Sequence, residues 1–189
     1  KKDTMRIETG AGVKILALTV ENGVCTRVCA DMGIAETDPA KVPVIGYDAP
    51  VIGQDCVLGG RNYRAVMLSM GNPHCVIFTD DPDALDLADI GARIGNDPQF
   101  PERVNVEFVR VLGETELQMR VWERGAGETL ACGTGACAAV VAAVENGYCD
   151  KGVDINVQVK GGVLYVRYDD DGVRLAGNAR LVYTGEMEY

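Results

Sequence analysis

The sequence predicts a mixed α/β fold in which one apolar helix is buried against antiparallel strands. Residues 133–146 are rich in Ala and Val without a strong polar face, and a helix that is apolar on all sides belongs in a core. Residues 6–24 and 155–173 each read as strand, Gly-containing turn, strand and an Asn-Gly or Asp-Gly turn, which is typical hairpin chemistry. With 189 residues the chain is long enough to enclose such a core.

The composition narrows the class of protein. Apolar residues make up 47% of the chain and charged residues 24%, close to the average of globular domains, and the longest apolar runs are far shorter than the ~20 residues of a membrane span. The net charge is −10 and the isoelectric point about 4.6, so a nucleic-acid backbone or an anionic membrane would be repelled. We therefore expect no nucleic-acid and no membrane partner.

The cysteines favour a reducing compartment. There are seven of them, an odd number without the regular spacing of a disulfide framework. The first residues do not have the pattern of a signal peptide, so we expect a cytoplasmic location. The sequence begins with Lys1 rather than Met, which suggests a start within a longer protein.

The two hairpin segments also predict a domain arrangement. If residues 155–173 repeat residues 6–24, the helix before the second copy should have a counterpart before the first, upstream of Lys1. The alternative is two unrelated hairpins. On the repeat interpretation, residues 1–33 and a terminal strand at 178–189 belong to an N-terminal domain. Residues 34–177 then form a complete C-terminal domain, entered through the Pro-containing segment 39–50.

The start of the apolar helix is the first candidate site. Cys132 is followed by Gly133, Thr134 and Gly135, where the unpaired N–H groups and the positive end of the helix dipole favour an anion such as a carboxylate. The same field lowers a cysteine pKa. We therefore predict that Cys132 is a reactive, low-pKa thiol beside a carboxylate-binding helix start.

Other interpretations of this segment are weaker. Residues 133–138 match the G-x-G-x-x-A dinucleotide pattern, but residues 123–131 are too rich in Gly and charge for the strand that must precede it. Cys132 and Cys137 lack the C-x-x-C spacing of a zinc site. We therefore expect no metal and no cofactor, and we interpret Cys137 and Cys149 as packed core residues.

Two further segments carry candidate polar residues. A Gly-Asn-Pro turn separates two apolar runs and projects Asn72 and His74. His74 is the only histidine in the chain, so any Cys-His or Ser-His mechanism must use it; otherwise a lone histidine is more often structural. Asn105 interrupts the start of an apolar strand, where by itself it could be a turn residue or an edge cap.

Together these segments resemble the diaminopimelate epimerase family. The matching motifs are Gly-Asn-Pro-His at 71–74, Val-Asn at 104–105, Glu-Arg-Gly at 123–125 and Ala-Cys-Gly-Thr-Gly at 131–135, in this order. Proline racemases share the Cys-Gly-Thr-Gly helix start, but the first and third motifs favour the diaminopimelate enzymes. The resemblance covers essentially the whole chain.

The resemblance implies a fold and a function. The fold pairs two similar α/β halves, each a curved sheet around a buried central helix. The activity is a cofactor-independent interconversion of LL- and meso-diaminopimelate by two cysteines, in lysine and peptidoglycan biosynthesis, by a homodimer. The alternatives are a related proline or other amino-acid racemase, and a catalytically incompetent module that only binds a ligand or partner.

The resemblance also assigns roles in the C-terminal half. Cys132 matches the catalytic acid or base, and Gly133 and Thr134 match the helix-start donors that hold the reacting carboxylate of the substrate. Glu123 and Arg124 match substrate-binding positions, and the Arg124 guanidinium offers a bidentate partner for a carboxylate.

The remaining matches concern polar contacts and assembly. Asn72 and Asn105 match residues that contact the substrate. His74 and Glu123 match residues that modulate the protonation of the cysteine pair. Tyr183 matches a tyrosine associated with the dimer contact.

One departure from the family pattern is informative. The second catalytic cysteine of the family lies in a Cys-Gly-Asn-Gly motif, which the 189 residues do not contain. Cys25 and Cys29 fall on a predicted strand and do not match it. We therefore expect the chain to be the C-terminal part of a longer enzyme and to be incomplete for activity as given.

Overall fold

A computed structural model describes residues 3–10 and 12–188 of the chain. The described part contains one 12-stranded sheet, two α-helices and a short 3-10 helix. The strands are β1 (Thr4–Thr9), β2 (Gly12–Glu21), β3 (Val24–Gly33), β4 (Ile52–Leu58), β5 (Arg61–Ser69), β6 (Pro73–Phe78), β7 (Asn105–Gly113), β8 (Glu116–Glu123), β9 (Gly127–Glu128), β10 (Asp154–Val159), β11 (Gly162–Asp169) and β12 (Gly172–Gly177). The helices are η1 (Pro82–Ala84), α1 (Leu87–Gly95) and α2 (Gly133–Glu145).

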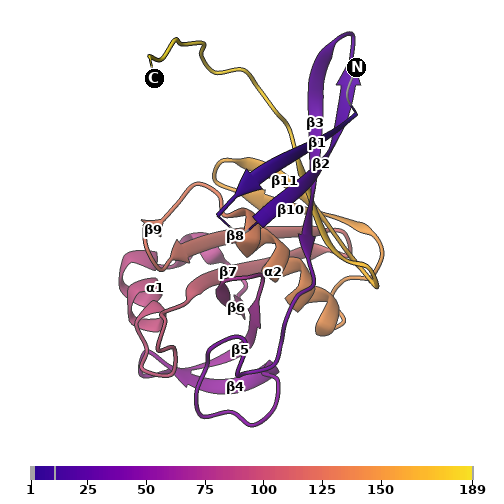
Figure 1. Cartoon of the computed structure of the whole chain (residues 1–189). Helices are drawn as coiled ribbons and strands as arrows, with labels where there is room; N and C mark the ends of the chain where they lie inside the picture. Colours follow the sequence, from indigo (N-terminus) through magenta and orange to yellow (C-terminus); the bar gives the residue numbers. More distant parts are fainter. Residues whose placement is uncertain (1–2, 11, 189) are drawn as a thin grey trace.

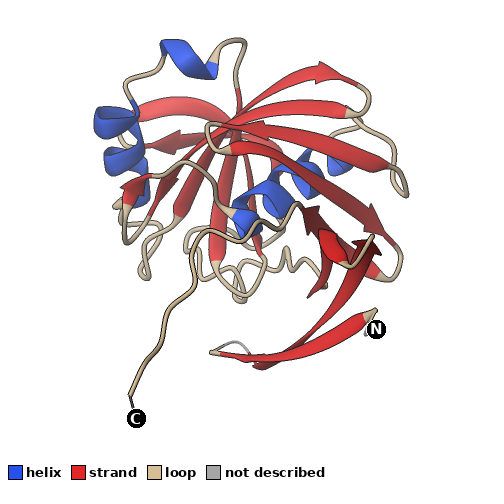
Figure 2. Cartoon of the chain, turned by 90° about the horizontal axis from the view of Figure 1, so that it is seen from above, coloured by secondary structure: helices blue, strands red, loops and turns tan. Residues whose placement is uncertain are grey.

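The sheet is mixed and runs through the whole molecule. Its strand order is β1-β2-β3-β12-β11-β10-β8-β7-β6-β5-β4, with β9 paired to β8 alone. Most neighbours are antiparallel, but β6 pairs with β7 and β8 with β10 in parallel. In Figures 1 and 2 the strands from β5 to β12 curve around α2. The sheet therefore forms a shell around one helix.

The helix α2 is the centre of the larger core, as the sequence predicts. Its residues 135–143 are all buried, and they pack with apolar side chains of β5, β6, β7, β8, β10, β11 and β12. Ala and Val side chains keep the helix narrow enough for strands to approach it from several sides. Its extent, Gly133–Glu145, agrees with the predicted helix at 133–146 to within one residue.

A second core lies on the other face of strands β4 to β7. It contains Leu87, Ile90 and Ile94 of α1, which pack with Phe108 and with other buried side chains from β4 to β7. Asp86 caps α1 by accepting a hydrogen bond from the Asp89 N–H group at 3.3 Å. Strands β5 to β7 are therefore covered on both faces, which explains why residues 65–69, 73–77 and 105–109 are consecutively buried. In the described part of the chain, no helix has the length and apolar character needed to cross a membrane.

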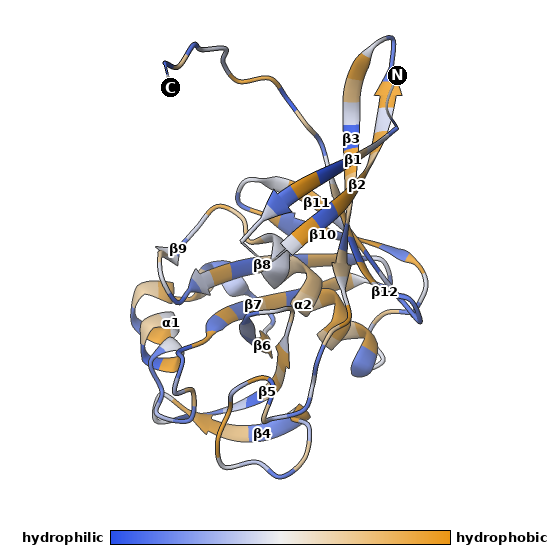
Figure 3. Ribbon diagram, in the orientation of Figure 1, coloured by the Kyte–Doolittle hydropathy of each residue, from blue (hydrophilic) through white to orange (hydrophobic). Residues whose placement is uncertain are grey.

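The two hairpin segments follow the same path. β1, β2 and β3 form an antiparallel meander, as do β10, β11 and β12, and β3 pairs with β12. β1, β2 and β3 extend away from the body of the molecule (Figure 1), and hydrophobic and hydrophilic residues alternate along β1 and β2 (Figure 3). The assignment of residues 1–33 to a separate domain remains a prediction.

The predicted terminal strand at 178–189 is not formed. Residues 178–188 have no strand pairing and run away from the sheet (Figure 1), and residue 189 lies outside the described part of the chain. Leu181, Val182 and Tyr183 are each more than four-fifths exposed. A strand requires a neighbouring strand that supplies hydrogen bonds, and β12 already has β11 and β3 on its two edges. In the described part of the chain, residues 178–188 therefore have no strand beside them with which to pair.

Candidate active site

Cys132 is the N-cap residue of α2. Its backbone is extended, with φ −129° and ψ 115°, which directs the side chain back over the first turn. The Gly135 N–H group donates a hydrogen bond to Sγ at 3.3 Å, and Oγ1 of Thr134 lies 3.5 Å from Sγ. Cys132 is 8% exposed. The thiol therefore takes the capping role that an oxygen-bearing side chain usually fills.

Burial opposes the predicted low pKa of Cys132. Loss of solvent is the largest effect and raises the thiol pKa above its ordinary value. The hydrogen bonds from Thr134 and Gly135 lower the pKa, whereas the nearby carboxylates of Glu107 and Glu123 raise it. The predicted lowering of the Cys132 pKa was therefore wrong. The prediction considered the field at the start of the helix and left out the effect of burial.

A chain of hydrogen bonds leads from Cys132 into the core. The Asn72 amide nitrogen donates to Thr134 Oγ1 at 3.2 Å, and its oxygen lies 3.1 Å from His74 Nε2. His74 Nδ1 is 2.7 Å from Oε1 of Glu107, and both side chains are fully buried. The turn before β6 delivers Asn72 to this position, and its Gly71 has a φ of +93° that favours glycine.

Asn105 joins two of the predicted segments. It is the first residue of β7, where it is 3% exposed. Its side-chain nitrogen donates to the Pro73 carbonyl at 3.1 Å, and its oxygen accepts from the Arg124 N–H group at 3.0 Å. Asn105 therefore ties the Gly-Asn-Pro-His turn to the Glu-Arg-Gly turn. The Arg124 guanidinium donates to the Glu102 carbonyl at 3.0 Å.

Glu123 is the last residue of β8. Its carboxylate accepts a hydrogen bond from the Thr129 hydroxyl at 2.6 Å. Thr129 also contacts the carbonyl of Ala131, the residue before Cys132, at 3.4 Å. The loop that leads into α2 thus places Glu123 close enough to Cys132 for its charge to raise the pKa of the thiol.

Sequence comparison decides the family. The diaminopimelate epimerase family profile matches residues 66–189. A diaminopimelate epimerase of Pelotomaculum thermopropionicum is 47% identical over 190 residues, covering 100% of this chain and 67% of the relative. The diaminopimelate epimerase of Desulfovibrio desulfuricans is 46% identical and is covered to 67%, and that of Bacillus cytotoxicus is 45% identical and is covered to 64%.

The chain belongs to the diaminopimelate epimerase family. It spans about two thirds of the length of these relatives. Among solved structures it is similar to a hydroxyproline epimerase from Agrobacterium vitis, with a TM-score of 0.66 and 15% identity over 94% of this chain and 57% of that one. A predicted epimerase from Pseudomonas aeruginosa has a TM-score of 0.58 and 18% identity over 96% of this chain and 67% of that one. At these identities the likeness shows the fold alone.

Within this family fold, Glu107 is the site residue that sequence reasoning missed. It is fully buried, and its Oε2 atom has no hydrogen-bond partner. The sequence did contain a signal, because Glu107 is a carboxylate between apolar residues of the strand, two positions after Asn105. Because strand residues two apart face the same side, Glu107 should have been grouped with Asn105.

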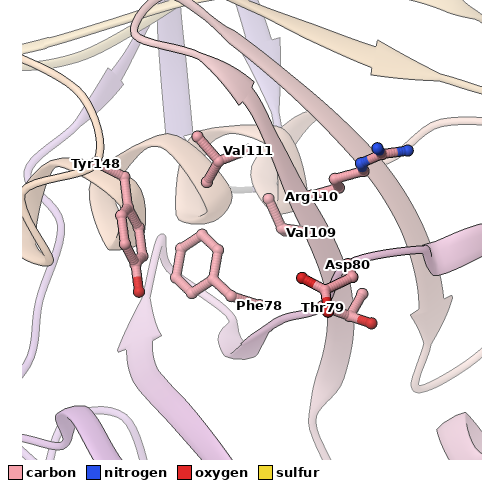
Figure 4. Close-up of a pocket in the computed structure, with 7 residues that line it drawn as sticks. All are labelled: Phe78, Thr79, Asp80, Val109, Arg110, Val111 and Tyr148. Atoms are coloured by element: carbon pink, nitrogen blue, oxygen red, sulfur yellow. The ribbon is translucent and has the colours of Figure 1, made fainter.

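The structure does not bring every feature to this site. Tyr183 lies in the exposed tail. A surface pocket of about 860 Å³ is lined by Phe78, Asp80, Arg110 and Tyr148 among others (Figure 4). Tyr148 follows the C-terminal end of α2, so the pocket is separated from the Cys132 end by a helix about 20 Å long. In this epimerase fold it is not part of the candidate active site.

Proposed function

We propose that the chain supplies one acid–base group and the carboxylate-binding helix start of a cofactor-independent diaminopimelate epimerase. The observation that carries this proposal is Cys132 at the N-cap of α2, hydrogen-bonded by Gly135 and in contact with Thr134. Membership of the family supports diaminopimelate as the substrate.

The chemistry explains why a thiol at a helix start suits this reaction. Inversion of an α-carbon requires removal of its proton from one face and delivery of a proton to the other, so an acid and a base must flank the carbon. Charge then develops on the substrate carboxylate, where oriented N–H groups stabilise it. In the proposed reaction Cys132 serves one face, and the N–H groups of Gly133 and Thr134 hold the carboxylate.

The polar residues around Cys132 have separate roles in this proposal. Asn72 and Asn105 orient the substrate, and Arg124 provides a cation for a substrate carboxylate. Glu123 and His74 influence which protonation state Cys132 adopts. The hydrogen bonds that join Asn72 to Thr134 and Asn105 to Arg124 support this grouping.

Assembly and location complete the proposal. We infer a homodimer in which Tyr183 contacts the partner, supported by the exposed apolar residues Leu181, Val182 and Tyr183 in one segment. The seven cysteines are all free thiols, as expected for a protein that works in a reducing compartment such as the cytoplasm.

Exchange of the substrate α-proton tests the role of Cys132. LL-diaminopimelate is incubated with the chain in D₂O, and deuterium incorporation at the α-carbon is followed by mass spectrometry. We expect slow incorporation that Cys132→Ala abolishes and that Cys149→Ala leaves unchanged, because Cys149 lies beyond the other end of α2. Equal incorporation by wild type and Cys132→Ala would overturn the proposal.

A further inference from the structure

The Glu107 carboxylate has only one compensating partner in the described part of the chain. Both the Glu107 and the His74 side chains have zero exposed area, and His74 Nδ1 lies 2.7 Å from Glu107 Oε1. The second oxygen of Glu107 has no hydrogen-bond partner. A buried carboxyl group that is only half satisfied is costly, so its one contact, with His74, is strongly held. This contact fixes the orientation of the His74 ring in the core.

The orientation of the His74 ring also fixes the direction of the next hydrogen bonds. With the Asn72 oxygen facing Nε2 at 3.1 Å, the ring nitrogen must be the donor. The Asn72 nitrogen then donates to Thr134 Oγ1 at 3.2 Å. Because this oxygen already accepts from Asn72, its own proton is free to point at Cys132 Sγ, 3.5 Å away. All three contacts are then consistent with a donor direction that runs from His74 to the thiol.

Gly135 allows this arrangement to lie against the first turn of α2. A Cβ atom at position 135 would lie 2.7 Å from Oε1 of Glu107 and 3.3 Å from Sγ of Cys132. The backbone at Gly135 therefore separates the buried carboxylate from the thiol at close range. Its N–H group meanwhile donates to that thiol. A side chain here would push the two groups apart.

We propose that Glu107 is a positioning residue that holds the His74 ring with Nε2 facing Asn72 and so directs the hydrogen bonds through Asn72 and Thr134 toward Cys132. This inference rests on the proposed function, because it assigns the network to the acid–base group of that reaction. Glu107 does not need to touch the substrate for this role. It stabilises the thiolate of Cys132 through the network while its own charge opposes the thiolate directly through space.

The effect of Glu107 through the hydrogen bonds favours the thiolate of Cys132, whereas its effect through space opposes the thiolate. An experiment can therefore tell the two effects apart. The titratable groups that face Sγ are Glu107 from β7, Glu123 from β8 and Cys137 from α2, with His74 of β6 reached through the hydrogen bonds. Replacement of Glu107 by Gln removes the negative charge, which by itself would favour the thiolate. It also replaces the charged partner of the His74 ring by a neutral one, so the ring is held less strongly and its hydrogen bond to Asn72 weakens.

The rate at which Cys132 is alkylated reports how these two effects of Glu107 combine, and its measurement needs no substrate. The rate of iodoacetamide labelling at Cys132 is followed by peptide mapping at several pH values in wild type, Glu107→Gln, Thr134→Val and the double variant. With Thr134 present, we expect Glu107→Gln to slow labelling about threefold or more and to move the rate profile to higher pH. With Val at position 134 the path is interrupted, so Glu107→Gln should no longer slow labelling.

The decisive comparison is between the effect of Glu107→Gln when Thr134 is present and its effect when position 134 is Val. Equal effects of Glu107→Gln with and without the Thr134 hydroxyl would mean that Glu107 acts only through space, and would overturn the proposal. Glu116→Gln is the matched control, because Glu116 pairs with Gln158 at the far end of β8 and should leave Cys132 labelling unchanged. Slow labelling of the buried Cys137 reports that each variant is folded.

The single histidine gives a second test in the wild-type chain. Nitrogen-15 NMR of labelled imidazole has one signal pair to assign, and we expect Nε2 to carry the proton that faces Asn72. An unprotonated Nε2 would overturn the proposal even if Glu107→Gln fails to fold. Neither test measures epimerisation. They can therefore support the role of Glu107 even if deuterium exchange contradicts the proposed function, and deuterium exchange can support that function even if they contradict the role of Glu107.

Discussion

A Cβ atom added to Gly135 would lie 2.7 Å from Oε1 of Glu107, a distance at which one of the two groups must move. Gly135 is buried in the first turn of α2, and Glu107 is fixed by its hydrogen bond to His74. The strand β7 and the N-terminal end of the helix therefore approach each other at a position that only glycine fits.

Gly135→Ala should therefore destabilise the chain even though alanine favours helix. We expect a loss of about 1–3 kcal/mol, the usual cost of overpacking a core, measured by urea unfolding. The control is Gly113→Ala, because a Cβ at Gly113 would have nothing within 4 Å. Equal stability of the two variants would show that Glu107 moves aside easily.

Whether the sequence predicted a feature correctly depends on whether the interactions behind that feature are local or join distant parts of the chain. The helix at 133–146 and the hairpin turns are encoded locally, by uniform apolarity and by Asn-Gly and Asp-Gly turns, so both were found. The link from Asn72 to Thr134 joins residues 62 positions apart. No local pattern encodes such a contact, and only the family resemblance grouped the two residues.

Burial was the quantity that sequence reasoning estimated least well. It missed Glu107, because charged residues are rarely placed in a core, and it predicted the wrong direction for the Cys132 pKa. It also predicted a strand in the tail, where the apolar residues have no neighbouring strand. In each case the outcome depends on what surrounds the residue, which composition and periodicity do not specify.

Asn105→Ala should be costly because Asn105 bridges two turns. The substitution leaves the buried Pro73 carbonyl without the side-chain donor and the Arg124 N–H group without its acceptor. We expect a loss of about 1–3 kcal/mol of unfolding free energy, the range for unsatisfied buried polar groups. Thermal unfolding monitored by circular dichroism measures it.

The control for Asn105→Ala is Asn62→Ala, since Asn62 lies exposed on β5. A melting temperature that falls equally in both variants would contradict the bridging role. The Asn105 variant should also weaken diaminopimelate binding in calorimetry, because Arg124 loses its fixed backbone position.

Cys132 and Cys137 should differ sharply in reactivity with iodoacetamide. Burial raises the pKa of Cys137 to about 12, and its side chain has zero exposure. At pH 9 roughly one Cys137 in a thousand would be thiolate. Cys132 is partly accessible and receives hydrogen bonds from Gly135 and Thr134, so we expect it to be labelled at least tenfold faster.

The pH dependence of this labelling has a defined direction. Because burial places the Cys132 pKa above its ordinary value, the rate should still rise with pH beyond the point where an exposed thiol levels off. Peptide mapping after timed labelling between pH 7 and pH 10 provides the measurement. Preferential labelling of Cys137 would contradict the assignment of Cys132 as the reactive thiol.

A polypeptide of these 189 residues by itself should exchange the α-proton of LL-diaminopimelate without efficient inversion. One thiol can remove and return a proton on one face, but delivery to the other face requires a second acid, and water would serve only poorly. The same chain extended upstream through a helix that begins with Cys-Gly-Asn-Gly should produce meso-diaminopimelate. Chiral chromatography alongside deuterium analysis separates exchange from inversion. Rapid inversion by the shorter polypeptide would mean that Cys25, Cys29 or a group other than a thiol supplies the second proton, and the two-cysteine mechanism would then not apply.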